Sequence, residues 1–210
     1  MSLADLTLKY AYSSDHDDLL NDFYVPVLEQ TCFYRRLTGF FTSTSLSLAV
    51  RGIVGLIRNE GRICLIAAPR LTQEDVQVLD ASKKDPVTTA LLRDLNELQD
   101  EFARDHLFAL AWMVANNRLE IRLAIPLDHQ DKPLTCQQVM DQGIFHQKVG
   151  ILEDRDGNVL SFSGSINETA MAWTENIEEF KVFRSWESAE IAYVKADIDK
   201  FDRLWQGRSE

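Results

Sequence analysis

The sequence predicts an α/β fold, a mixed β-sheet flanked by helices on both faces, in a single domain over residues 1–210. Short apolar runs of strand length alternate with longer amphipathic stretches, and two of these runs flank the turn sequence "DRDGN". No internal repeat or low-complexity linker divides the chain. With 45% hydrophobic and 26% charged residues, the composition is that of an ordinary globular protein able to bury a core.

In the first half, we expect helices at 15–30 and 42–61 and strands at 35–41 and 62–69. Ser13 and Ser14 are expected to cap the first helix, and Pro26 predicts a kink or a restart within it. Gly39 allows close approach of the backbone at the end of the first strand. The run "RICLIAAP" is continuously apolar, which is typical of a strand covered on both faces.

In the second half, we expect a polar helical region at 72–117, a strand at 118–126, a polar loop at 127–143, two strands around the turn at 154–158, a short helix near 165–173, a strand at 178–186 and a helix at 187–207. The loop at 127–143 is long enough to act as a lid or to face a ligand.

The net charge of -11 argues against a protein that binds nucleic acid by general phosphate neutralisation, because such proteins are usually basic. Contact with nucleic acid would then need local positive charge, or help from another domain or subunit. No apolar run is long enough for a membrane span and no signal pattern opens the chain, so we expect a cytoplasmic protein without a membrane partner. The three cysteines lack CxxC spacing and are expected to be free buried thiols.

The stretch "GIFHQKVGILEDRDGNVLSFSGSINET" carries polar residues within apolar runs. On a strand, His146 and Lys148 would share one side, and Gly150 would leave a groove beside them open. The alternative is a satisfied structural pair at the edge of a sheet.

The returning strand is expected to place Ser161, Ser163 and Ser165 opposite that pair, with Asn167 at its end. Together these side chains could bind a phosphoryl group, because the lysine offsets its charge while hydroxyl and amide groups hold its oxygens. The histidine could attack phosphorus or protonate the leaving oxygen. No carboxylate cluster accompanies them, so neither a metal nor a cofactor is implied.

"HQK" and "GSIN" resemble the HxK and GSxN signature of the phospholipase D superfamily. Together with "YRRLTGFFTSTSLSLAVRGIVGLIRNEGRICLIAAPRL" and "AWMVANNRLEIRLAIP", nearly the whole chain resembles the single-signature, phospholipase D-like domain at the N-terminus of some bacterial DEAD/DEAH-type helicases and restriction or defence proteins. The resemblance implies one nuclease-type domain over 1–210, the N-terminal part of a longer helicase-type protein.

The resemblance also implies roles for individual residues. His146 would be the nucleophile that forms a phosphohistidine, and Lys148, Ser165 and Asn167 would hold the phosphate oxygens. Ser163, Gly164 and Glu179 are supporting candidates.

An acidic residue about eleven positions after the asparagine orients the histidine in nucleases of this superfamily, and this count leads to Glu178. Only one of Glu178 and Glu179 can point inward from a strand, and we favour Glu178 because it shares a side with Phe180 and Val182. One departure is Glu153, followed by Asp154, where the superfamily usually has an aspartate, and this weakens the match to true phospholipases.

The superfamily builds one active site from two signatures, whereas this chain has one, because His16, His106 and His129 lack the context. The resemblance therefore implies a homodimer with a shared active site, and dimerisation could bury apolar surface around Phe40–Phe41 and Trp173.

Taken together, the sequence predicts a metal-independent phosphodiesterase that acts on DNA, as a nuclease module fused to or associated with a helicase motor or a restriction system. The alternative is a catalytically silent module of a helicase for nucleic-acid binding or dimerisation, which the net charge of -11 favours slightly. A phospholipase is disfavoured because no amphipathic or basic membrane-binding stretch is present.

Overall fold

The computed structural model describes residues 1–39, 50–68, 113, 115–125, 127, 128, 130, 132, 134, 145–167 and 175–207. Their strands are β1 (Ala11–Ser13), β2 (Phe33–Thr38), β3 (Arg62–Ala67), β4 (Leu119–Leu123), β5 (Val149–Glu153), β6 (Val159–Gly164) and β7 (Glu179–Arg184). Their helices are η1 (Leu3–Asp5), η2 (Leu19–Tyr24), α1 (Val25–Gln30), α3 (Val50–Arg58) and α9 (Ile191–Trp205).

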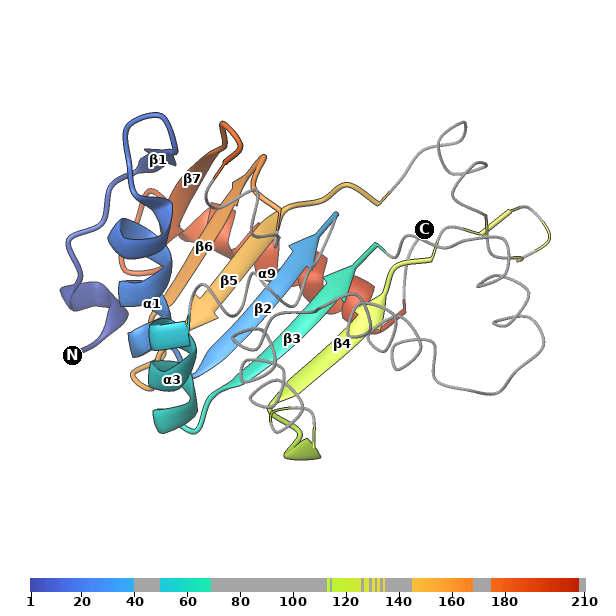
Figure 1. The fold of residues 1–210 in the computed structure, drawn as a ribbon, viewed down its shortest axis with the longest axis horizontal. Helices are drawn as coiled ribbons and strands as arrows, with labels where there is room; N and C mark the ends of the chain where they lie inside the picture. The colour runs from blue at the N-terminus through green and yellow to red at the C-terminus, as the bar shows by residue number, and fades with distance from the viewer. Residues whose placement is uncertain are drawn as a thin grey trace.

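The strands form one seven-stranded sheet in the order β1-β7-β6-β5-β2-β3-β4 (Figure 1). Neighbours from β1 through β7, β6 and β5 to β2 are antiparallel, whereas β2–β3 and β3–β4 are parallel. The predicted α/β class, the mixed sheet and the hairpin around the "DRDGN" turn are therefore confirmed.

Helices cover both faces of the sheet (Figure 1). On one face, which we call the α1 face, η2, α1 and α3 bury an apolar cluster in which Phe23, Tyr24, Phe162 and Phe180 pack edge-on or tilted against one another. On the other, the α9 face, α9 packs through Phe201. Burying large apolar side chains on both sides is the main stabilising contribution, at about 1.5–3 kcal/mol for each. It also holds the strand ends in fixed positions.

The N-terminal segment differs from the prediction. Ser13 ends strand β1 and does not cap a helix, because pairing with β7 buries the Tyr12 side chain in the core. Asp18 caps η2 instead, accepting a hydrogen bond from the Asn21 N–H at 3.0 Å. The predicted restart at Pro26 is confirmed, since α1 begins at Val25 with the proline in its first turn.

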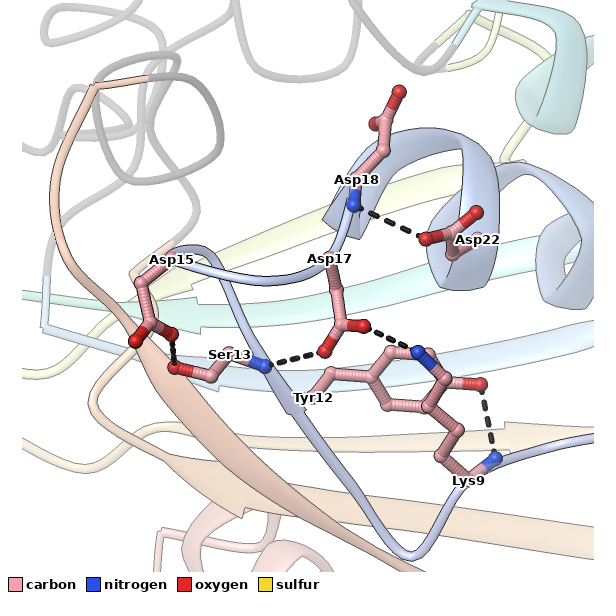
Figure 2. A network of polar contacts seen from close by, with 7 residues as sticks. All are labelled: Lys9, Tyr12, Ser13, Asp15, Asp17, Asp18 and Asp22. Carbon is pink, nitrogen blue, oxygen red and sulfur yellow. Dashed lines mark hydrogen bonds and ion pairs between the residues drawn. The ribbon is translucent and has the colours of Figure 1, made fainter.

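Carboxylates fix the turn between β1 and η2, as Figure 2 shows. Asp17 accepts a hydrogen bond from the Ser13 N–H at 2.8 Å and forms an ion pair with Lys9, while Asp15 accepts from the Ser13 hydroxyl. The hydrogen bond from Lys9 is the main reason that the pKa of Asp17 is lowered. This acidic stretch therefore organises a turn rather than forming a solvated helix face.

The remaining differences concern strand limits and coverage. β5 begins at Val149, so the segment with His146 and Lys148 is extended chain that leads into the strand, not part of it. The expected polar helical region at 72–117, the loop at 127–143 and the short helix after Asn167 lie mostly or wholly outside the described residues. Among the described helices, none has the length and apolarity that a bilayer span requires.

Candidate active site

Three predicted site residues meet around Gly39, which directly follows β2. A Cβ atom built on this glycine would lie 3.1 Å from the Asn167 Oδ1 atom, 3.2 Å from the His146 Cδ2 atom and 3.5 Å from the Lys148 Nζ atom. Residues from three separate segments, the end of β2, the approach to β5 and the exit from β6, thus surround one point. A side chain on residue 39 would crowd that point, and the glycine keeps it clear.

His146 and Lys148 differ in their exposure to solvent. His146 is exposed, so a ligand can reach its imidazole, whereas Lys148 is only 7% exposed. The Lys148 ammonium donates a hydrogen bond to the His146 carbonyl at 3.2 Å. Burial lowers the pKa of Lys148, and the charge of Arg36 lowers it further, while the charge of Glu178 opposes the shift. An anion bound beside this ammonium would stabilise its charged form.

Glu178 is anchored close to the signature residues. The residue is 7% exposed, and its carboxylate accepts hydrogen bonds from the Ser165 hydroxyl and, at 3.2 Å, from the Asn176 amide. Glu179, by contrast, is exposed and forms an ion pair with Lys181. Glu178 and not Glu179 therefore lies on the buried side, beside Ser165.

Ser14, which lies just after β1, holds the backbone that carries Glu178. Its hydroxyl donates to the Asn176 carbonyl at 2.8 Å and accepts from the Glu178 N–H at 2.9 Å. Its own N–H donates to the Glu178 carbonyl at 3.0 Å. Three hydrogen bonds thus join the N-terminal segment to the start of β7.

The expectation that the serines of β6 face Lys148 is wrong. Ser163 pairs with Val149 and Ser161 with Ile151, so both serines belong to the α9 face. The register of the hairpin places Gly164 opposite Lys148 instead, and a one-residue slip would have exchanged the two sides.

Gly164 has a packing role. A Cβ atom there would lie 2.1 Å from the Glu179 carbonyl oxygen, so the glycine permits β6 and β7 to approach closely. Ser165, one residue beyond the strand, is the serine that reaches the site through Glu178.

The expected open groove at Gly150 is also absent, because the ring of Phe162 occupies that space. A Cβ atom on Gly150 would lie 2.1 Å from the Phe162 Cε1 atom. Neither a role for Arg36 nor a place for Ser14 in the site was predicted from the sequence. The pair "RR" within a buried strand was the available signal for Arg36, since adjacent residues must point to opposite faces and both faces are covered. Ser14 carried no sequence signal beyond its capping propensity.

Solved structures similar to this chain include the phosphatidylserine synthase of Haemophilus influenzae. It is 14% identical, with a TM-score of 0.50, over 92% of this chain and 38% of the synthase chain. The two chains share a fold. NucT from Helicobacter pylori is 12% identical with a TM-score of 0.47, over 90% of this chain and 94% of its own.

Nuc from Salmonella typhimurium, a phospholipase D family member, is 13% identical with a TM-score of 0.47, over 91% of this chain and 92% of its own. No protein-family model and no curated protein sequence matches the chain.

Asp154, which follows Glu153, organises the turn of the β5–β6 hairpin. The Asp154 carboxylate is buried and accepts hydrogen bonds from the Leu3, Asp156 and Asn158 N–H groups at 2.8–2.9 Å. Glu153 instead pairs with Arg35 at 3.1 Å. The hairpin and the N-terminal segment are therefore organised by the residue next to the expected position.

The other singled-out residues fall outside this constellation or outside the described residues. The His16 side chain is 82% exposed beside Asp15. Cys64 is buried and Cys32 half-buried, and burial raises the pKa of both thiols. The residues that lie beyond the described part of the chain are Phe40, Phe41, His106, His129, Cys136 and Trp173.

Proposed function

We propose that this domain is a metal-independent phosphodiesterase that hydrolyses DNA through a phosphohistidine formed on His146. The observation that supports it most directly is the meeting of His146, Lys148 and Asn167 around the bare backbone of Gly39. An ammonium and a carboxamide beside an accessible imidazole suit a phosphodiester, which brings a negative charge and oxygen acceptors to a nucleophile.

In the first step, the lone pair of an imidazole nitrogen of His146 attacks phosphorus. A P–N bond forms, the P–O bond to the leaving oxygen breaks, and a general acid gives that oxygen a proton. Lys148 and the amide of Asn167 stabilise the charge that builds on the phosphate oxygens. In the second step, water attacks phosphorus and gives a proton to the group that acted as general acid, the P–N bond breaks, and a phosphomonoester leaves with the imidazole restored.

Glu178 supports this chemistry in the proposal. The resemblance to superfamily nucleases assigns it the orientation of His146. We assign it a second role, to keep Lys148 charged, because its charge favours the protonated form of that lysine. The carboxylate is held in place by a hydrogen bond from the Ser165 hydroxyl. A charged Lys148 is the form that binds an anion.

The general acid in the proposal is His146 of a second subunit, so the working unit is a homodimer with one shared active site. We further propose that the domain works in the cytoplasm as a module of a helicase or restriction system. Such a partner would supply the positive charge for DNA binding that a chain with a net charge of -11 lacks.

The test measures cleavage of DNA and of a bis-aryl phosphodiester in excess EDTA. We expect activity to persist under chelation and to fall at least about 10³-fold in His146→Ala, because the nucleophile is removed. His16→Ala is the matched control, since it removes another exposed histidine, which is distant from His146 in sequence and forms an ion pair with Asp15. Loss of wild-type activity on chelation would contradict the mechanism.

Measuring DNA binding and the cleavage of phospholipid vesicles alongside this test separates the alternative functions. DNA that binds without being cut, while the aryl diester is also untouched, would favour the silent binding module. Cleavage of phospholipid in vesicles without cleavage of DNA would place the substrate among lipid headgroups.

A further inference from the structure

Arg36 is a fully buried cation beneath the candidate site. It lies on β2 with 0% of its surface exposed, and it pairs with Gly150 on the α1 face of the sheet. Burying a guanidinium is costly unless its donors are hydrogen-bonded and its charge is balanced. An apolar residue would fill this position in an ordinary core, so the arginine calls for a specific explanation.

The contacts of Arg36 lead to the signature segment that follows β6. The guanidinium lies over the Phe162 ring, 4.9 Å from its centroid, and this ring occupies the space that the missing side chain of Gly150 leaves. From there the Arg36 Nη2 atom donates a hydrogen bond to the Ile166 carbonyl at 2.5 Å. Ile166, which stands between Ser165 and Asn167 in the sequence, is itself buried. Arg36 therefore holds the backbone at the point between the two signature residues.

The charge of Arg36 also acts on the site. It lowers the pKa of Lys148, in addition to the larger effect of burial, and the carboxylate of Glu178 acts in the opposite direction. In the described chain, three titratable or charged groups lie around the Lys148 ammonium. They are Arg36 from β2, Glu178 from the segment before β7, and His146 from the segment before β5 that also carries Lys148. Arg36 thus contributes a fixed positive charge below the place where an anion would sit.

We propose that Arg36 is a positioning residue: it fixes the backbone between Ser165 and Asn167 through the Ile166 carbonyl and sets the electrostatic field at Lys148. The effect of Arg36 on turnover rests on the proposed phosphodiesterase function. The effect of Arg36 on Lys148 is independent of that function, and it can be measured even if the protein hydrolyses no substrate.

The chain offers a matched control in the preceding residue. Arg35 lies on the same strand and is 7% exposed, but it pairs with Glu153 at 3.1 Å on the α9 face. Arg35→Met and Arg36→Met therefore each remove a buried arginine, from opposite sides of β2. Arg36→Lys keeps the charge but loses the planar guanidinium that reaches Ile166 while lying over Phe162.

The experiment measures turnover of a bis-aryl phosphodiester as a function of pH, and follows the titration of Lys148 by NMR in protein labelled at the lysine ε-carbon. In Arg36→Met, we expect kcat to fall about 10²-fold because Asn167 is no longer held in place. We also expect the pKa of Lys148 to rise, because a neighbouring cation has been removed. In Arg36→Lys, kcat should fall about 10-fold while the Lys148 titration stays near that of the wild type. Arg35→Met should change neither quantity.

A Lys148 titration and a kcat in Arg36→Met that both match Arg35→Met would overturn the inference. If Arg36→Met does not fold, Arg36→Lys decides, because an unchanged kcat there contradicts the positioning role. If the wild type hydrolyses no phosphodiester, the proposed function fails on its own, and the Lys148 titration alone decides the role of Arg36. A raised pKa then supports that role, and an unchanged pKa rejects it.

Discussion

Among single residues, Gly39 provides the most direct test of where the anion sits. In Gly39→Ala, the new methyl group would lie 3.1 Å from the Asn167 Oδ1 atom and 3.2 Å from the His146 Cδ2 atom, so these two side chains must move by a few tenths of an ångström, whereas the Lys148 Nζ atom at 3.5 Å stays in ordinary contact. Turnover is sensitive to such displacements, and we expect kcat/KM to fall about 10- to 100-fold with little loss of thermal stability. Phosphate affinity, measured by calorimetry, should fall in parallel. A variant that binds phosphate as the wild type does would show that the anion sits elsewhere.

Sequence patterns correctly predicted which side of the sheet a residue faces only where the prediction depended on a single strand. The alternation of Glu178, Phe180 and Val182 is enough to turn Glu178 inward, and its burial agrees with that pattern. Ser161 and Ser163 depended on pairing between two strands, and alternation within either strand cannot set that register. The contacts of Arg36 were beyond the sequence for the same reason, because they cross from β2 over β5 to the end of β6.

At the scale of elements, β1 contributes more to the candidate site than its three residues suggest. It leads into Ser14, whose hydroxyl connects the Asn176 carbonyl to the Glu178 N–H. In Ser14→Ala, we expect the free energy of unfolding to fall by about 1 kcal/mol through the lost hydrogen bonds. Because Glu178 is then less firmly held, we expect kcat to fall about 10-fold.

The control for this element is Ser13→Ala, since the Ser13 hydroxyl bonds to Asp15 at the surface and not to the β7 segment. Urea unfolding and steady-state kinetics should separate the two variants. Equal kcat values in Ser13→Ala and Ser14→Ala would contradict a role of β1 in the site.

Long apolar runs predicted elements well, and short or polar ones did not. β3 and β4 lie within the ranges expected for them, because a buried strand needs a continuous or alternating apolar run. β1 was missed because its stability comes from pairing with β7 at the far end of the chain, and its own sequence reads equally well as a helix cap. The limits of β5 were wrong for a related reason, since the strand starts only where β2 and β6 can pair with it.

In the whole molecule, the described residues form one candidate constellation, whereas the proposed mechanism needs both a nucleophile and a general acid. Ile177, next to Glu178, is 85% exposed, but a single exposed apolar side chain is common on protein surfaces and does not by itself mark an interface between subunits. The net charge of -11 makes each subunit repel its copy, so such an interface would have to gain its stability from apolar contact.

Mixing subunits tests the shared site. When equal amounts of wild type and His146→Ala are refolded together, random pairing leaves about one quarter of the dimers with two intact histidines. If both histidines act in one site, turnover of the mixture should fall to about one quarter of that of the same total amount of wild type, whereas independent subunits would retain about one half. Refolding wild type with His16→Ala controls for losses during mixing, because both histidines at position 146 remain. A mixture that retains one half, or a protein that is active as a monomer in light scattering, would require the general acid to come from within the same chain.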